Sequence, residues 1–424
     1  MRLAYVIVSY LFAPVYALYW LFRGVAENAY WERFGQRFGF GYPDLPGGTI
    51  WIHAVSVGEV QATAPLVRQL AKRFPDRPML VTTVTPTGAA RARALFGDSV
   101  AHSYVPYEAS CAVNRFFAAV KPDLALIMET EIWPNLYYAC GRRNIPLVLV
   151  SARISPRSVG KYRRWLPLFR ETLSFGIVIA AQSEADAERF RSLGANPLRT
   201  SVTGNIKFDI ELPGDLQDKG AKLRSQHFGK RPVWIAASTH DGEEGQLLDA
   251  HARLRASLPD ALLVLVPRHP DRFSNVAAHL SRRGIKYVAR TQGVACTPDT
   301  EVFLGDTMGE VPLFYAASDI AFVGGTLVPV GGHNLLEPAA LGLPIVTGPH
   351  LFNTEDIAEM FSSVGASRLV HSDRELARTL QEWFENPELA QAIGNKGRDI
   401  VIQNRGALDR FLTLLQPLMK GIGG

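Results

Sequence analysis

The chain has 424 residues, of which 47% are hydrophobic and 20% are charged, and it carries a formal net charge of +5. This length exceeds one comfortable core and predicts two domains, and the composition excludes a disordered chain. The mild basic excess suits an anionic surface or substrate; without an RNA-binding aromatic signature we expect no nucleic acid partner. The 3 cysteines and 10 histidines are scattered, so we expect neither a disulfide framework nor a metal site.

The first predicted element is an apolar helix at residues 1–23. Residues 3–22 carry no charge, and about 20 helical residues span roughly 30 Å, the thickness of a bilayer core. The segment has no small-residue cleavage site at its end, so we expect it to be retained as a membrane anchor. Pro14 and the many aromatic residues favour a kinked or interface-hugging helix. A buried helix of a soluble protein is the alternative.

Basic residues after this helix predict its orientation. Positive charge next to a membrane helix is typical of the cytoplasmic side. The residues concerned are Arg23, Arg33 and Arg37. If the helix is an anchor, we expect the following domain to lie on the cytoplasmic side.

Beyond the anchor, short apolar runs of strand length alternate with helical patterns. They occupy residues 49–55, 79–84, 123–128, 146–151 and 176–181, and then 233–238, 261–267, 301–306, 319–325 and 344–348. Near-continuous apolar strands separated by helices are typical of a parallel, doubly wound sheet. A polar stretch with Pro and Gly at 202–220 interrupts the alternation. We therefore predict an α/β protein with two Rossmann-like domains, residues 24–210 and 211–424, facing each other across a cleft.

Glycines gather around a His-Asn pair between Gly324 and Gly348, after a predicted strand and before a helix that starts near Asn334. Such a cluster indicates that the backbone turns sharply or approaches a ligand closely. Amides at a helix start bind phosphate, and Glu337 can accept hydrogen bonds from a ribose. The absence of GxGxxG and GxxxxGK[ST] argues against a dinucleotide dehydrogenase or a P-loop NTPase. The alternative is a glycine-rich turn with Glu337 as an ordinary first-turn acid.

Two other segments follow predicted strands of the second half. Arg268 and His269 come after 261–267, where an arginine can hold a phosphate or a carboxylate bidentately. A solvated loop is the alternative. Residues 308–310 open a helix after 301–306 and offer a second set of backbone donors at the same edge.

Carboxylates follow two strands of the first half. Glu59 is either a general base or, with Ser56, part of a capping box, and the spacing alone favours the cap. Glu129 and Glu131 can orient hydroxyl groups or raise each other's pKa. The basic segment 151–165 suits the phosphates of a membrane lipid, or is a solvated helix face.

The chain resembles the bacterial lipid A-specific Kdo transferases, glycosyltransferase family 30, in order and over nearly its whole length. The segments that carry the resemblance are VSVGEV, METEIWPN, SARIS, GNIKFD, PRHPDRF, DTMGE and GGTLVPVGGHNLLEPAALGLPIVTGP. The family transfers 3-deoxy-D-manno-octulosonic acid (Kdo). The resemblance implies a GT-B fold, CMP-Kdo as donor, the lipid A precursor lipid IVA as acceptor in lipopolysaccharide core biosynthesis, inversion, and neither cofactor nor nucleotide-binding metal. It also implies a place at the cytoplasmic face of the inner membrane.

The resemblance further implies residue roles, and it makes Glu59 the catalytic base despite the capping spacing. Donor contacts are expected at Lys207, Arg268, His269, Met308, Gly309, Glu310, Gly332, Asn334 and Glu337. Acceptor or sugar contacts are expected at Ser56, Gly58, Glu129, Glu131 and Arg153. The alternatives are a GT-B relative that acts on a UDP-sugar, a nucleotide-sugar epimerase of similar architecture, and a non-catalytic, membrane-anchored clamp for an anionic ligand.

Overall fold

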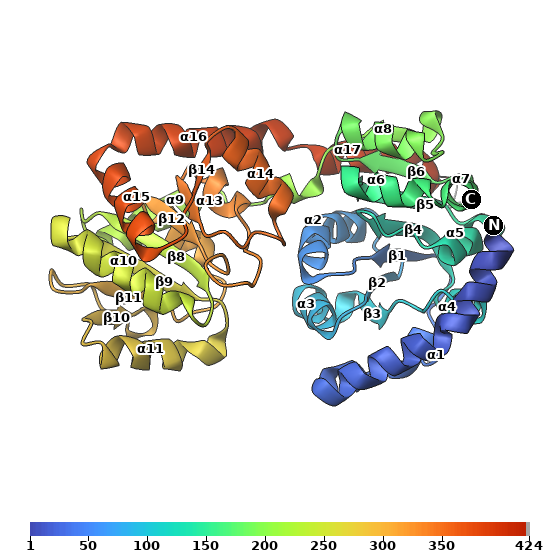
Figure 1. Cartoon of the computed structure of the whole chain (residues 1–424), viewed down its shortest axis with the longest axis horizontal. Helices are drawn as coiled ribbons and strands as arrows, with labels where there is room; N and C mark the ends of the chain where they lie inside the picture. The colour runs from blue at the N-terminus through green and yellow to red at the C-terminus, as the bar shows by residue number, and fades with distance from the viewer. Residues whose placement is uncertain (421–424) are drawn as a thin grey trace. The chain divides into compact units, whose positions relative to one another are not determined.

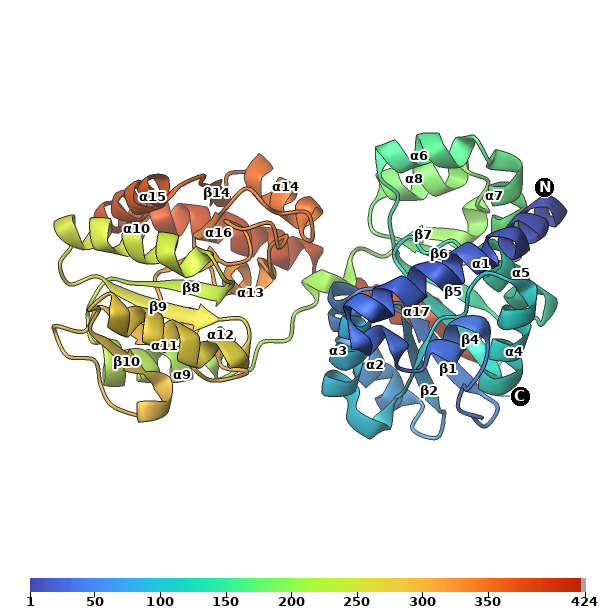
Figure 2. The ribbon, with the colours of Figure 1, turned by 60° about the horizontal axis from the view of Figure 1, so that its bottom comes forward.

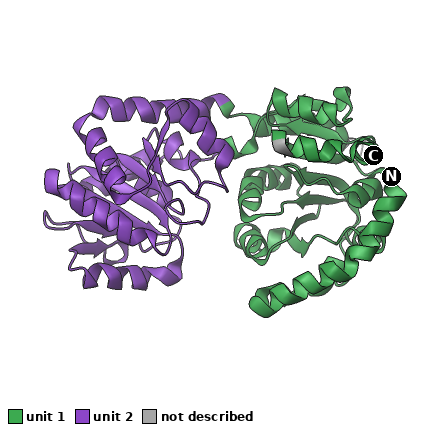
Figure 3. Ribbon diagram, in the orientation of Figure 1, with its two compact units in different colours: residues 1–209, 404–424 green, residues 210–403 purple. Residues whose placement is uncertain are grey.

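The computed structural model describes residues 1–420, which form two compact units (Figure 3). Unit 1 contains residues 1–209 and the C-terminal segment from residue 404, and unit 2 contains residues 210–403. Each unit holds one seven-stranded sheet, and every strand pair in the two sheets is parallel. The predicted α/β class with two parallel sheets is confirmed.

The sheet of unit 1 has the strand order β3-β2-β1-β4-β5-β6-β7 (Figure 1). Its strands are β1 (Thr49–His53), β2 (Met79–Thr83), β3 (Ala101–Tyr104), β4 (Pro122–Met128), β5 (Leu147–Ala152), β6 (Val178–Ala181) and β7 (Thr200–Val202). Its α-helices are α1 (Arg2–Ala26), α2 (Val57–Arg73), α3 (Pro86–Phe96), α4 (Ser110–Val120), α5 (Pro134–Arg142), α6 (Pro156–Arg163), α7 (Leu166–Leu173), α8 (Glu184–Ser192) and α17 (Ala407–Lys420).

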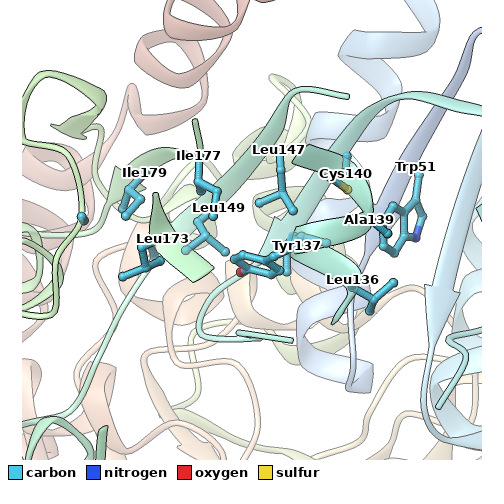
Figure 4. Close-up of a cluster of buried hydrophobic side chains, with 14 of the residues drawn as sticks. Trp51, Leu136, Tyr137, Ala139, Cys140, Leu147, Leu149, Leu173, Ile177 and Ile179 are labelled. Atoms are coloured by element: carbon cyan, nitrogen blue, oxygen red, sulfur yellow. The ribbon is translucent and has the colours of Figure 1, made fainter. Parts of the chain in front are cut away.

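The strands of unit 1 are buried on both faces, which explains why they read as continuous apolar runs. Along β1, Trp51 joins one core, while Ile50 and Ile52 join the core on the opposite face. Figure 4 shows the first core, in which Trp51 and the α5 residue Tyr137 lie among aliphatic side chains of the sheet. The Trp51 indole donates a hydrogen bond to the Thr82 hydroxyl at 2.8 Å, so that its buried polar group is satisfied.

The sheet of unit 2 has the strand order β10-β11-β9-β8-β12-β13-β14. Its strands are β8 (Val233–Thr239), β9 (Leu262–Pro267), β10 (Tyr287–Ala289), β11 (Val302–Leu304), β12 (Ile320–Val323), β13 (Ile345–Thr347) and β14 (Ser367–Leu369). Its α-helices are α9 (Leu216–Leu223), α10 (Glu243–Ser257), α11 (Phe273–Arg282), α12 (Val311–Ala316), α13 (Leu336–Ala340), α14 (Glu355–Ser363), α15 (Asp373–Glu385) and α16 (Pro387–Asn404).

The last helix, α17, belongs to unit 1 and not to the second domain in which the sequence placed all residues from 211 to 424. Its apolar side chains, among them Phe411 and Leu415, join the unit 1 core that contains Ile50 and Ile52. The Asp209 carboxylate accepts the N–H groups of Gly406 and Leu408, both at 2.6 Å. The chain therefore returns to unit 1, because α17 buries its apolar face on that sheet.

The N-terminal helix α1 lies against unit 1 (Figure 2). The Tyr5 hydroxyl donates to the Glu108 carboxylate at 3.0 Å, and Tyr107 donates to the Ser9 carbonyl at 2.8 Å. Tyr16 stacks on Tyr107 with ring centroids 4.3 Å apart. By length and composition α1 is apolar enough to cross a membrane, as the sequence predicts.

The opposite face of α1 is apolar and exposed. Leu3 is 75% exposed, Leu11 69%, Phe22 72% and Val25 76%. Further along the chain, the Arg37 guanidinium is buried 3.7 Å from the centre of the Trp20 ring, so it is not the free juxtamembrane charge that the sequence indicated. The helix thus has one face that contacts the protein and one that does not.

Candidate active site

Glu59 lies at the start of α2, directly beyond the carboxyl end of β1. The Ser56 hydroxyl caps this helix by accepting the Glu59 N–H at 3.3 Å. The Glu59 carboxylate accepts the Val55 N–H at 2.9 Å and the Ser56 hydroxyl at 3.2 Å. The capping arrangement is therefore formed, and it also holds the carboxylate in one place.

A second carboxylate approaches from the end of β4. The Glu129 carboxylate forms an ion pair of 2.5 Å with the Lys207 ammonium, and both side chains are more than two thirds buried. The structure thus places Lys207 beside the carboxylates of unit 1, whereas the resemblance implied that it contacts the donor.

The backbone around this pair is strained. Glu129 has φ of 53° and Ser151 has φ of 49°, in the left-handed region that costs a residue with a side chain about 1–2 kcal/mol. Both stand at the carboxyl ends of strands. The Ser151 hydroxyl accepts the Ile206 N–H at 3.1 Å, which fixes the segment that carries Lys207. Strain of this kind collects where surrounding contacts hold side chains for function.

Glu131 and Arg153 complete this edge of unit 1. The Glu131 carboxylate accepts the Trp133 indole N–H at 2.7 Å, and its carbonyl accepts the Tyr137 hydroxyl at 2.9 Å. Arg153 follows β5, and its carbonyl accepts the Thr130 hydroxyl. These bonds tie the loop after β4 to the loop after β5.

Gly58 lies in the first turn of α2, with the Ser56 hydroxyl 3.9 Å from where a Cβ would be.

The electrostatics of this group favour a base that titrates near neutrality. Burial, and then the charge of Glu129, raise the pKa of Glu59 to about 8. The Val55 N–H and Lys207 oppose that rise. Burial also raises the pKa of Glu131. A carboxylate of this kind can accept a proton from an alcohol, because its pKa lies close to the pH at which it operates.

In unit 2, three histidines and an arginine gather beyond the carboxyl ends of β8 and β9. The Nε2 atoms of His240 and His333 are 2.7 Å apart, and the two rings stack with centroids at 5.0 Å. The His269 ring meets His240 edge-on at 5.5 Å. Within residues 1–420 the half-buried Arg268 side chain has no hydrogen-bond or ion-pair partner, so its guanidinium can receive an anion.

Burial, followed by the neighbouring His240, lowers the pKa of His333 to about 3. Burial, followed by His269, also lowers the pKa of His240. Arg268 contributes to both shifts. Both imidazoles are therefore neutral near pH 7, and Arg268 supplies positive charge beside them that an anionic ligand can pair with.

The glycine-rich loop differs from the expectation that its amides are free for a phosphate. The buried Glu243 carboxylate accepts the N–H groups of Gly325 at 2.7 Å, Thr326 at 2.9 Å and Leu327 at 2.9 Å. The N–H groups of Gly331 and Gly332 donate to the Gly325 carbonyl at 3.0 and 2.8 Å. A side chain of the protein, and not a ligand, therefore occupies this set of donors.

The glycines serve turns and close packing here. A Cβ on Gly324 would lie 2.5 Å from the Ser238 carbonyl oxygen on β8, and a Cβ on Gly348 would lie 2.3 Å from the Thr326 carbonyl oxygen. Gly331 and Gly332 have φ of 106° and 81°. Only glycine fits these positions without a shift of the backbone.

Of the remaining predicted donor residues, Glu337 lies in the first turn of α13 and the others lie in loops of unit 2. The Asn334 side chain accepts the Leu336 N–H at 3.0 Å and donates to Glu337 at 3.1 Å, so it forms an Asx turn just before α13. Glu310 is held bidentately by Arg290, at 2.9 and 3.1 Å, which lowers the pKa of Glu310. Met308 is 59% exposed. Gly309 has open space around a hypothetical Cβ.

Sequence reasoning missed three of these residues, His240, His333 and Glu243. A signal was present for His240, because the segment THDGEE follows the predicted strand 233–238 directly. Ligands bind beyond that end in open α/β sheets. The pairing of Glu243 with amides more than 80 positions away has no local signature.

Two family models match the chain. Residues 32–210 match the family described as 3-Deoxy-D-manno-octulosonic-acid transferase (kdotransferase), and residues 245–400 match Glycosyl transferases group 1. The chain is similar to the 3-deoxy-D-manno-octulosonic acid transferase of Haemophilus influenzae, with 42% identity over 93% of each chain. It is also similar to the enzyme of that name from Bordetella pertussis, with 37% identity over 95% of this chain and 96% of that one.

Among solved structures, the UDP-GlcNAc 2-epimerase of Neisseria meningitidis bound to UDP-GlcNAc matches with a TM-score of 0.55 and 17% identity. The match covers 87% of this chain and 100% of that one, and it shows a shared fold alone. With the group 1 match, the two parallel units give the chain a GT-B glycosyltransferase fold. The relatives, which align over nearly its full length, show that the chain belongs to the 3-deoxy-D-manno-octulosonic acid transferases and is a glycosyltransferase.

Proposed function

We propose that this glycosyltransferase moves Kdo from CMP-Kdo to lipid IVA with inversion, releasing CMP, and that Glu59 is the general base. The observation that carries the proposal is the Glu59 carboxylate itself, held by Val55 and Ser56 with a pKa of about 8. The family membership supplies the transferred sugar. The donor nucleotide and the acceptor follow from the motifs that the chain shares with the lipid A-specific members.

In this mechanism an acceptor hydroxyl attacks the anomeric carbon of Kdo while its proton passes to Glu59. The bond between that carbon and the phosphate oxygen breaks, and CMP leaves with the electron pair. The Glu129 carboxylate is already paired with the Lys207 ammonium at 2.5 Å, so Glu59 and not Glu129 is the proposed base. Glu131 and Arg153 are proposed to position the acceptor or the transferred sugar.

The departing CMP carries a phosphate monoester, whose second pKa is about 6, so it leaves well when positive groups receive its charge. Arg268 is the proposed receiver, because it lies close enough to His240 and His333 for its charge to lower the pKa of both. The Nε2 atoms of His240 and His333 share one proton, so the neutral pair keeps one further N–H group that can donate to the ligand. Gly332, Asn334 and Glu337 are proposed to contact the nucleotide through their side chains or carbonyls.

The test is a transfer assay with CMP-Kdo formed in place and a tetraacylated lipid A precursor, read by mass spectrometry of the lipid. Mass should rise in units of Kdo with the native protein and not with Glu59→Gln. Glu188→Gln, an exposed glutamate of the same unit, is the matched control and should transfer normally. No mass gain with folded, detergent-dispersed native protein would refute the proposed reaction.

We further propose that α1 attaches the enzyme to the cytoplasmic face of the inner membrane and lies in the plane of the interface. Its contacts with the rest of unit 1 run from Arg2 to Trp20. A helix that crossed the bilayer would have to break them, whereas a helix lying flat keeps them and inserts its exposed apolar face. Arg23, near the end of α1, is exposed on the surface.

Spin labels at Leu3→Cys, Leu11→Cys and Phe22→Cys, in a chain without its native cysteines, test this geometry. A helix in the plane gives three similar, shallow depths in the bilayer. A steady change of depth from the first label to the last would contradict the proposal and indicate a spanning helix.

A further inference from the structure

A basic hollow of about 550 Å³ lies on unit 1, under the N-terminal end of α1. Its lining includes Arg2 from α1, Asn114 from α4, Asn135 and Tyr138 from α5, and Arg142 and Arg143. A volume of this size falls in the range of small-ligand sites, roughly 300–1,000 Å³. The transferase site uses none of these six residues.

The hollow concentrates positive charge on an aromatic platform. The Arg2 guanidinium carbon lies 2.8 Å from the centre of the Tyr138 ring, and that of Arg142 lies 5.9 Å from it. Arg143 donates to the Ala139 carbonyl at 3.2 Å and to the Asn114 side-chain oxygen at 3.0 Å. In the part of the chain that the structure describes, none of the three arginines has an acidic ion-pair partner. Arginines in this state select anions, phosphate above all, because the guanidinium fork matches its oxygens.

Two buried polar atoms of the lining have no partner within the described residues. They are the Nε of Arg2, a donor, and the Oδ1 of Asn135, an acceptor. Asn135 is 3% exposed, and its amide nitrogen is already committed to the Glu108 carbonyl at 2.5 Å. Buried polar groups are normally hydrogen-bonded, so the Arg2 Nε lacks an acceptor and the Asn135 Oδ1 lacks a donor, and a ligand that reaches both after a small side-chain shift would have to accept and donate. A phosphate next to a hydroxyl group has that chemistry.

The place of the hollow decides where such a ligand comes from. Arg2 is part of α1, whose exposed apolar face we have proposed to lie in the membrane interface. A basic hollow at the end of that helix therefore stands at the level of the lipid headgroups. We propose that it binds a lipid headgroup that carries a phosphate and a hydroxyl, as a membrane site separate from the transfer reaction. The inference rests on the proposed membrane attachment.

Vesicle flotation tests it, with phosphatidylcholine vesicles that contain either phosphatidylglycerol or, at the same surface charge, oleate. The native protein should prefer the phosphatidylglycerol vesicles. The variant Arg142→Lys/Arg143→Lys keeps the charge but loses the guanidinium groups that bind phosphate bidentately. Its preference for phosphatidylglycerol should therefore fall roughly tenfold, which corresponds to ~1.4 kcal/mol, about the smallest contribution expected of one charge-assisted hydrogen bond. The control Arg282→Lys/Arg378→Lys changes two exposed arginines of unit 2 and should behave as the native protein.

Equal binding of the native protein to both vesicles, or a full preference in Arg142→Lys/Arg143→Lys, would overturn the proposal. Soluble glycerol phosphate should abolish the preference without releasing the protein from the vesicles, since α1 still holds it. Calorimetry of glycerol phosphate with the detergent-dispersed protein makes the same comparison without a bilayer. Calorimetry thus shows whether the hollow binds glycerol phosphate even if the protein does not attach to vesicles, so the two proposals can fail separately.

Discussion

Replacement of Glu129 and replacement of Lys207 should shift the pKa of Glu59 in opposite directions. Glu129 raises the pKa of Glu59, and Lys207 lowers it. With a pKa of about 8, about one tenth of the Glu59 carboxyl groups are ionised at pH 7, so kcat/KM should rise about tenfold between pH 7 and pH 9. Glu129→Gln removes a negative neighbour and should move this rise to lower pH. Lys207→Met removes a positive neighbour and should move it to higher pH.

The assay is the initial rate of Kdo transfer at subsaturating acceptor across this pH range, because kcat/KM reports groups of the free enzyme. The double variant should lie between the two single variants, and Glu188→Gln should reproduce the native profile. Shifts of the same sign in both single variants would refute the electrostatic reasoning. A native pH rise that persists in Glu59→Gln would show that another group is the base.

Three other predictions concern packing, the glycine-rich loop and the donor site. Leu415→Ala should lower the free energy of unfolding by about 2–4 kcal/mol in a urea titration because it opens a cavity in unit 1, and the exposed Gln416→Ala should change it by less than about 0.5 kcal/mol; equal effects would argue against α17 as part of that core. Glu243→Gln should cost at least about 2 kcal/mol in the same experiment, since the loop amides lose a charged acceptor; an unchanged stability would contradict the role given to this carboxylate. His240→Ala and Arg268→Lys should raise the KM for CMP-Kdo and leave that for the acceptor unchanged, and the opposite pattern would move the donor away from the histidine cluster.

The sequence predicted the central strands and missed the edges. Each of the ten predicted runs contains or overlaps a strand, and all lie inside the two sheets. The unpredicted strands β3, β7, β10 and β14 are the four edge strands. An edge strand is only partly covered, and the residues of β14, for instance, are half-buried or exposed. Its side chains need not be apolar, so hydrophobicity alone does not reveal it.

In the candidate site, the contact between residues close in sequence could be predicted, and the contacts between distant residues could not. The Ser56–Glu59 capping box is written in four consecutive residues, and the structure forms it. The ion pair between Glu129 and Lys207 joins residues 78 positions apart, and the histidine pair joins residues 93 positions apart. No periodicity or spacing encodes such contacts. They arise only when the parallel strands of one sheet bring their carboxyl ends to the same edge.

The return of α17 to the first sheet affects the order in which the protein is made. Translation delivers residues 1–209 first, but one face of their sheet stays uncovered until Phe411, Leu412 and Leu415 have been made, after the whole of unit 2. Residues 210–403 need no later segment to complete their own unit and can close around their core while still tethered to the ribosome. A fragment that stops at residue 209 will leave an apolar sheet face uncovered, so the second unit is the piece to express alone.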